Sequence, residues 1–171
     1  MKFPILTISL IVTFIPFSLL SNTATSTPVY DVDGEPLIPE IGYYILPLIR
    51  GSGGSVELHY NGSCPYYIAQ AFSEVDYGFP SVWQLSDPEG DSGSRYVRVG
   101  RVLENPGEET VNRWFKIETH PRGDYKLVFC PTVCETCRPV CGDIGLLSQG
   151  DSRLLGLSDE PYRVVFKRKE D

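Results

Sequence analysis

Four cysteines in the C-terminal part of the chain form the pattern with the most obvious chemical potential. Cys130, Cys134, Cys137 and Cys141 follow the spacing Cys-x3-Cys-x2-Cys-x3-Cys. Four thiolates at this spacing could hold a zinc ion, and a Cys-x-x-Cys pair could be redox-active. In an oxidising compartment the same residues form disulfides instead. Four cysteines allow three pairings, of which a nested one would suit a strand–loop–strand hairpin.

The N-terminus favours disulfides over metal. Lys2 precedes an apolar run over 3–20 that contains no acidic or basic residue, and small and polar residues follow it. This order is typical of a secretory signal peptide. A membrane anchor is the alternative, but Pro4 and Pro16 interrupt the run and no basic stop-transfer cluster follows. We therefore expect export, to the extracellular space or the vacuole, and cysteines that are oxidised.

The remainder of the chain has the size of one domain. We predict a signal peptide over residues 1–24 and a single domain over 25–171. The chain has 22 acidic and 15 basic residues and a net charge of −7. Such a chain is a poor candidate for binding nucleic acid or, once the signal is removed, a membrane. The glycine-rich stretch 51–54 lacks the Lys-Ser/Thr of a phosphate-binding loop, and we expect no cofactor and no metal.

Residues 90–94 read Gly-Asp-Ser-Gly-Ser, a sequence similar to the one around the nucleophile of trypsin-like proteases. Such a serine needs a histidine base that is oriented by a buried carboxylate. His59 and His120 are the two histidines of the chain, and neither has the expected neighbours. We predict a turn here, and no enzyme.

The acidic stretch 31–35, Asp-Val-Asp-Gly-Glu, suggests a calcium loop. The glycine follows Asp33 directly, however, and no helical pattern flanks the stretch, as an EF-hand would require. We expect a polar turn before a strand.

Residues 61–63 form an Asn-Gly-Ser sequon between two predicted strands, which makes Asn61 a candidate for glycosylation. The next residue, Cys64, is the fifth cysteine of the chain. Because five is an odd number, at least one thiol has no partner within the chain.

Short β-type segments must position all of these residues. Runs rich in Val, Ile, Tyr, Phe and Trp alternate with Gly, Pro, Asp and Ser, and no sustained helical periodicity occurs. In the run 55–60, Val56, Leu58 and Tyr60 are expected on one face. This pattern predicts a sandwich or a barrel of about ten strands. The predicted strands are 42–46, 55–60, 66–71, 82–85, 96–99, 114–117, 125–130, 143–147, 153–157 and 162–167.

Several stretches resemble the plant Kunitz-type (soybean trypsin inhibitor) family, and in particular its miraculin-like branch. The N-terminal part reads VYDVDGEPL and then GYYILP over 42–47, and Cys64-Pro65 follows. Further stretches are NRWFKIE, YKLVFCP with CGDIG, and the closing RLLGLSDEP over 153–161. The resemblance covers nearly the whole mature domain.

The resemblance implies an all-β fold, the β-trefoil, with six hairpins in three-fold pseudo-symmetry. It also implies the disulfides Cys130–Cys141 and Cys134–Cys137. Members of this family inhibit serine proteases without catalysis, because a rigid surface loop presents an extended segment to the protease cleft. Such a loop loses little entropy on docking.

The chain departs from the family between Pro80 and Ser81. In relatives, the reactive-site loop, about two strands and the cysteine that pairs with the equivalent of Cys64 lie between these positions. We estimate that roughly 30 residues are missing, so the trefoil would lack about two strands. The reactive-site loop would then be deleted and Cys64 left as an unpaired thiol, able to link two copies in a disulfide-bonded dimer.

The function expected from these observations is that of a secreted, defence-related serine protease inhibitor by descent. The alternative is a non-inhibitory, miraculin-like binding or storage protein of the same fold. A carbohydrate-binding trefoil is disfavoured, because such lectins tend to carry Gln-x-Trp repeats and this chain has none.

Overall fold

The protein is built almost entirely from short β-strands. The computed structural model describes residues 27–62, 64–74, 82–101, 105–121 and 123–170. Each of the ten strands in these ranges overlaps one predicted segment, so the all-β prediction is confirmed. The strands are β1 (Tyr43–Pro47), β2 (Val56–His59), β3 (Tyr67–Gln70), β4 (Trp83–Leu85), β5 (Val97–Val99), β6 (Phe115–Thr119), β7 (Tyr125–Phe129), β8 (Gly142–Gln149), β9 (Ser152–Ser158) and β10 (Arg163–Arg168).

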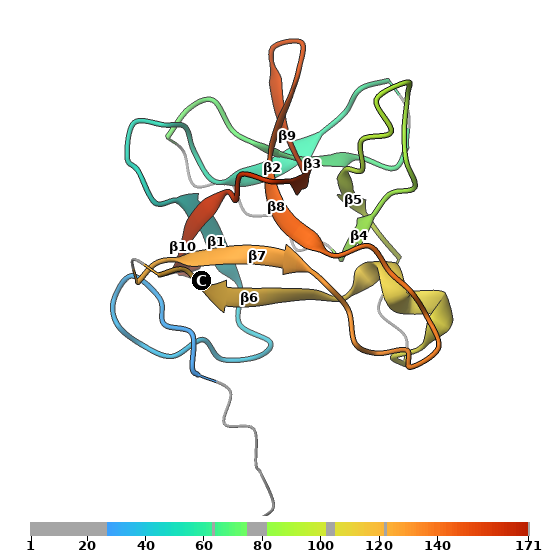
Figure 1. Ribbon diagram of the computed structural model, residues 1–171. Coiled ribbons are helices and arrows are strands. Elements are labelled where there is room, and N and C mark those ends of the chain that lie inside the picture. The colour runs from blue at the N-terminus through green and yellow to red at the C-terminus, as the bar shows by residue number, and fades with distance from the viewer. Residues whose placement is uncertain (1–26, 63, 75–81, 102–104, 122, 171) are drawn as a thin grey trace, which may run out of the picture.

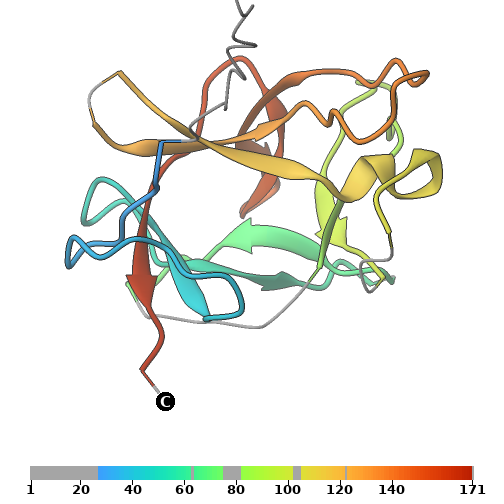
Figure 2. The same ribbon diagram turned by 90° about the horizontal axis from the view of Figure 1, so that it is seen from below.

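The strands form one antiparallel network around a central core (Figures 1 and 2). Its order is β1-β10-β7-β8-β9-β3-β5-β4, and β2 and β6 pair on the side with β3 and β7. Consecutive strands joined by short turns, such as β6–β7 and β8–β9, form hairpins. Within the described residues no ladder joins β1 to β4, so the sheet is not closed at these two edges.

The β8–β9 hairpin shows how the local sequence sets the register. Seven residue pairs run from Asp143↔Ser158 to Gln149↔Ser152. The turn between the strands contains Gly150 at φ +59°, a left-handed conformation that glycine adopts without steric cost. This turn defines which residues of the two strands face inward and which face solvent.

One hydrophobic cluster fills the interior. It consists of the buried side chains Ile68, Leu85, Val97, Leu127, Phe129, Ile144, Leu155, Tyr162, Val164 and Phe166. Val56 and Leu58 of β2 pack against this cluster, as their alternation predicts. Tyr60 does not: it lies beyond the end of β2, is 57% exposed, and has its ring 5.3 Å from that of Tyr66.

The element that sequence patterns missed is a 3-10 helix, η1 (Glu108–Arg113), between β5 and β6. A helix this short needs only a local turn and shows no amphipathic period. The signal for it was the turn sequence Asn-Pro-Gly over 105–107, directly before its first residue. Over the described part of the chain, no helix is long and apolar enough to span a bilayer.

Candidate functional site

The loop between β7 and β8 is cross-linked twice. Cys130 directly follows β7 and is bonded to Cys141, which directly precedes β8, and their Cα atoms are 4.5 Å apart. Cys134 is bonded to Cys137 within the loop, with Cα atoms 5.4 Å apart. The pairing in the structure is the one that the family resemblance implies. The first bond closes the base of the loop and the second constrains its tip.

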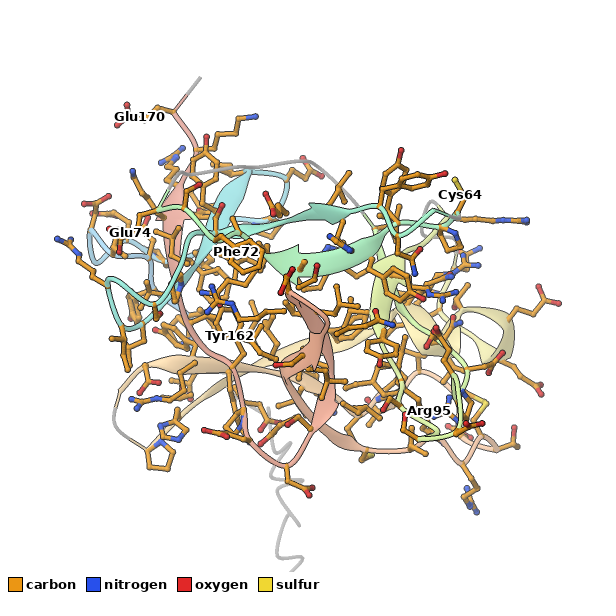
Figure 3. The ribbon with its side chains drawn as sticks, turned by 90° about the horizontal axis from the view of Figure 1, so that it is seen from above. Cys64, Phe72, Glu74, Arg95, Tyr162 and Glu170 are labelled. Carbon is orange, nitrogen blue, oxygen red and sulfur yellow. A yellow bond between two sulfur atoms is a disulfide. The ribbon has the colours of Figure 1, made fainter. Side chains whose placement is uncertain are left out.

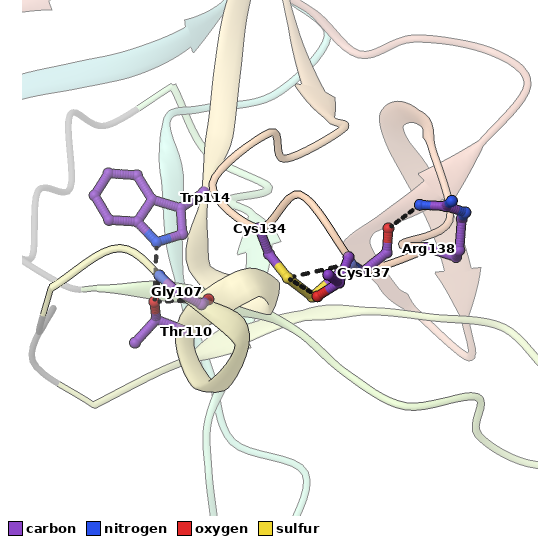
Figure 4. Close-up of a disulfide and its surroundings, with 7 residues drawn as sticks. Gly107, Thr110, Trp114, Cys134, Cys137 and Arg138 are labelled. Carbon is purple, nitrogen blue, oxygen red and sulfur yellow. Dashed lines mark hydrogen bonds between the residues drawn. A yellow bond between two sulfur atoms is a disulfide. The ribbon is translucent and has the colours of Figure 1, made fainter.

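An extended segment runs between the two disulfides. The backbone of residues 137–141 contains no turn or bend, and a disulfide holds each end. Arg138 and Val140 are exposed, with Val140 at 44%. Arg138 Nη1 donates a hydrogen bond to the carbonyl of Cys137, at 3.1 Å (Figure 4). The loop therefore presents a cationic side chain on a backbone that is fixed at both ends.

A hydrogen-bond cluster around Thr110 lies beside this loop (Figure 4). Thr110 is 4% exposed, and its hydroxyl accepts from the backbone N–H of Gly107 at 3.1 Å and from Trp114 Nε1 at 3.3 Å. The same hydroxyl donates to the carbonyl of Asn105 at 3.1 Å. These bonds tie η1 to the start of β6.

A second exposed arginine, Arg50, lies in the loop between β1 and β2. Its neighbour Ile49 is 67% exposed. The chain turns tightly here, because Gly51 has φ +82° and the hydroxyl of Ser52 donates to the carbonyl of Ile49 at 2.6 Å. Arg50 is therefore presented on a turn and not on an extended segment.

The serine-protease-like sequence over 90–94 is a turn, as predicted. Glu89 and Ser94 form a β-bridge, and the hydroxyls of Ser92 and Ser94 are hydrogen-bonded at 2.8 Å. The ring Nε2 of His59 lies 3.3 Å from the hydroxyl of Ser152, and His120 lies beside Asp124. Neither histidine is paired with Ser92, so the geometry of a catalytic triad is not present there.

The acidic stretch near the N-terminus is also a turn. One carboxylate oxygen of Asp31 accepts hydrogen bonds from the backbone N–H groups of Asp33, at 3.0 Å, and Glu35, at 2.9 Å. Within the described residues, no group of three or more His, Cys, Asp or Glu side chains could hold a metal ion.

The remaining predicted sites lie at the surface or outside the described ranges. Asn61 is exposed in the connection between β2 and β3. Cys64 is an exposed free thiol at the periphery of the molecule (Figure 3). The Pro80–Ser81 junction and the predicted signal peptide lie outside the described residues.

The all-β network is the scaffold called the β-trefoil. Exposed loops extend from it, and the β7–β8 loop is cross-linked twice. A Kunitz-type cysteine protease inhibitor from potato has the same fold, with a TM-score of 0.71, 29% identity, and 85% of this chain and 99% of that chain covered. The sequence model of the Kunitz legume family, described as trypsin and protease inhibitor, matches residues 29–81 and 80–168. The chain belongs to this family, which is a family of protease inhibitors and not of enzymes.

Two relatives illustrate the range of the family. Kunitz trypsin inhibitor 5 of Arabidopsis thaliana is 34% identical, over 93% of this chain and 94% of the relative. Miraculin of Synsepalum dulcificum is 35% identical, over 88% of this chain and 87% of the relative. The first alignment spans 186 positions, whereas 93% of 171 residues is about 159, so about 27 positions lie opposite no residue of this chain.

Proposed function

We propose that the protein is a secreted, defence-related inhibitor of trypsin-like serine proteases. In this proposal the β7–β8 loop with its two disulfides, residues 130–141, takes the place of the missing reactive-site loop; we call it the stapled loop. The observation that carries this proposal is the extended segment 137–141, which is held by a disulfide at each end and exposes Arg138. Trypsin-like proteases have an acidic group at the base of the primary specificity pocket, which accepts an arginine.

Three observations support the deletion of the usual loop. The family match falls into two segments that meet at residues 80–81. About 27 positions of the alignment with the Arabidopsis inhibitor have no counterpart in this chain. In addition, β1 and β4 are not joined by a ladder in the described residues.

The physical basis of inhibition is preorganisation. A segment that is fixed before binding loses little conformational entropy when it docks. Pro139 adds to this stiffness, because its ring fixes the backbone φ angle after Arg138. Arg50 is the weaker candidate, since the positive φ of Gly51 places it on a tight turn that does not match an extended protease cleft.

Inhibition assays with trypsin, chymotrypsin and subtilisin test the proposal. We expect the purified protein to inhibit trypsin and the R138A variant to be weaker by at least about 30-fold, as for a central interface residue. R138K should retain most of the inhibition, because the cation is kept. R50A is the matched control and should inhibit like the unmodified protein. Equal inhibition by R138A would show that another loop binds the protease.

The second candidate function is a non-inhibitory, miraculin-like binding or storage role. The missing reactive loop and the 35% identity to miraculin favour it. The absence of inhibition of all three proteases at micromolar concentration would support this candidate against the first.

Export is the part of the proposal that rests on the N-terminal sequence alone. The basic start and the apolar run over 3–20 support a cleaved signal peptide and an extracellular or vacuolar destination. N-terminal sequencing of the protein from its native tissue should give a first residue near 25. A protein that retains Met1 would contradict export by this route.

A further inference from the structure

A cleft of about 400 Å³ opens next to the end of β1, between β3, β8, β9 and the turn before β10. Its apolar walls are Pro47, Leu48, Ile49, Leu146 and Pro161. The volume lies within the range of pockets that hold small ligands, and the lining combines these apolar walls with polar and charged side chains that could orient a ligand. The cleft is separate from the stapled β7–β8 loop.

Three polar side chains that line this cleft each have an atom without a partner. These atoms are Gln70 Oε1, Arg153 Nε and the hydroxyl of Tyr162. Gln70 is only 1% exposed and Tyr162 only 7%. Buried polar atoms nearly always have hydrogen-bond partners. Three such atoms on one cleft therefore indicate a site for a polar ligand.

Neighbouring groups hold two of these side chains in place. The carbonyl oxygen of Ser52 accepts from Gln70 Nε2 at 3.2 Å and from Arg153 Nη1 at 2.7 Å. Because a carbonyl oxygen only accepts hydrogen bonds, the amide nitrogen of Gln70 faces Ser52, and Oε1 lies on the other side of the amide as an acceptor. The guanidinium of Arg153 also lies over the ring of Phe72, with 5.5 Å between the guanidinium carbon and the ring centroid.

Gly53 makes room for this arrangement. A Cβ atom at this position would lie 2.5 Å from Arg153 Nη2 and 2.7 Å from the carbonyl oxygen of Ala71. The backbone can therefore pass close to the guanidinium only because residue 53 is a glycine. The arginine is held at Ser52 while its Nε–H remains available as a donor.

The charge of the cleft favours an anion at Arg153. Among the described residues, no carboxylate oxygen lies within 4.0 Å of the Arg153 guanidinium, whereas Arg163 is paired with Asp124. Glu160 also lines the cleft but is exposed to solvent. Burial raises the pKa of Tyr162, against the opposing effects of Arg153 and of the nearby Gln70 side chain, so its phenol stays protonated and can donate a hydrogen bond.

We propose that this cleft binds a small α-hydroxy carboxylate. The carboxylate accepts hydrogen bonds from Arg153 Nε and from the hydroxyl of Tyr162, and the α-hydroxyl donates to Gln70 Oε1. The apolar part of the ligand packs on Leu48, Leu146 and Pro161. A ligand with both groups satisfies all three unpartnered atoms, which a simple anion or a simple alcohol cannot do. This site does not depend on protease inhibition.

Three matched probes test the proposed chemistry in ligand-observed NMR and calorimetric titrations of the purified protein. Mandelate carries a carboxylate, an α-hydroxyl and an apolar ring, phenylacetate lacks the hydroxyl, and 1-phenylethane-1,2-diol lacks the carboxylate. We expect mandelate to bind with a dissociation constant below about 1 mM. Each of the other two probes should bind at least about fivefold more weakly, because one hydrogen-bonded group is lost.

Two conservative variants connect the binding to the named atoms. Y162F removes a hydroxyl that lies near the Gln70 amide without a hydrogen bond of ordinary geometry, so we expect little loss of thermal stability and weaker mandelate binding. R153K keeps the charge but removes Nε–H, and it should also bind mandelate more weakly. R138A is the control, because no residue of the stapled loop lines the cleft, and it should bind like the unmodified protein.

Three outcomes would overturn the proposal. The first is no binding of mandelate up to about 10 mM, which would mean that ordered water alone satisfies the three atoms. The second is equal binding of the three probes, which would indicate an unspecific apolar cleft. The third is a Y162F variant that loses stability but binds mandelate normally, because the hydroxyl would then have a structural partner.

Discussion

Asp124 is a buried charged residue with two partners, Arg163 and His120. Its side chain is 3% exposed, and both of its carboxylate oxygens accept hydrogen bonds from the guanidinium of Arg163. Arg163 Nε donates to Oδ2, and Nη2 donates to Oδ1 at 2.6 Å. The ring Nδ1 of His120 lies 3.3 Å from one of these oxygens. Arg163 holds the pKa of Asp124 below its usual range, despite the opposing effect of burial. The pair connects the β6–β7 turn to the start of β10.

This lowered pKa predicts a specific loss of stability in acid. A carboxyl group whose pKa is lower in the folded state stabilises the fold above its unfolded pKa, about 3.9, and loses this contribution as the pH falls through the folded value. We expect D124N to lower the free energy of unfolding by about 1–3 kcal/mol at pH 6. The difference from the unmodified protein should shrink below about pH 4.

Urea unfolding monitored by fluorescence from pH 2 to pH 7 measures both quantities. D143N is a suitable comparison, because Asp143 also has a cationic partner, Lys126 at 2.7 Å, but is more exposed at 23%. We expect a smaller effect there. A D124N difference that stays constant down to pH 2 would contradict the assignment of the acid sensitivity to Asp124.

At the scale of the elements, two paired glycines determine how closely neighbouring segments approach the β8–β9 hairpin. Gly145 and Gly156 face each other across the two strands. A Cβ atom on Gly145 would lie 2.2 Å from the carbonyl oxygen of Glu160, and one on Gly156 would lie 2.5 Å from that of Arg95. Gly156 also forms a β-bridge with Tyr96. Both glycines belong to stretches that resemble the family, and close backbone approach is the physical reason for them.

We expect G156A to be destabilising by about 1–3 kcal/mol, because the added methyl group overpacks a buried contact with backbone atoms. Gly107 provides the control, since a Cβ atom there has no neighbour within 4 Å and its φ of 174° is ordinary extended backbone. G107A should therefore change the free energy of unfolding by less than about 0.5 kcal/mol. Urea titrations of the two variants test this, and equal effects would contradict the packing argument.

The two disulfides of the stapled loop should contribute unequally to stability. Cys130 and Cys141 are separated by 11 residues in the sequence, and Cys134 and Cys137 by three. In the chain-entropy estimate the longer loop gains about 3 kcal/mol and the shorter about 2 kcal/mol. We expect the C130S/C141S double variant to lose more stability in denaturant than C134S/C137S. The reverse order would mean that loop entropy does not govern the contribution.

At the scale of the whole molecule, the open edges and the free thiol predict association. Among the described residues β1 pairs only with β10 and β4 only with β5, so each has one unpaired side. Unpaired strand edges can pair with another chain. Cys64 is exposed and unbonded, so it could link two copies that have met in this way.

We expect one thiol per chain to react with Ellman's reagent in the folded protein. Mild oxidation should then produce a dimer on non-reducing gels. C64S should abolish both signals. Sedimentation of C64S at rising concentration separates association through strand edges from association through the thiol. A folded protein with no reactive thiol would contradict the prediction that Cys64 has lost its partner.

The sequence by itself determined the class of fold, the position of every strand and the family. Runs of β-favouring residue types and the turn residues between them are local signals, and in strands such as 125–130 and 153–157 they agree with the tertiary structure. The nested cysteine pairing was implied by resemblance and not by spacing, which allows three arrangements. The turns at 31–35 and 90–94 were also predictable, because the residues needed for metal binding or catalysis were missing from the chain.

Only the tertiary structure decided what depends on distance between remote segments. Gln70 is far in sequence from Arg153 and Tyr162, and no local pattern indicates that the three line one cleft. The same holds for the Asp124–Arg163 pair, and for the unjoined edges β1 and β4. A side chain's partners depend on how strands pair across the whole sheet, whereas strand formation depends mainly on neighbours along the chain. For this reason local structure could be predicted and the binding surfaces could not.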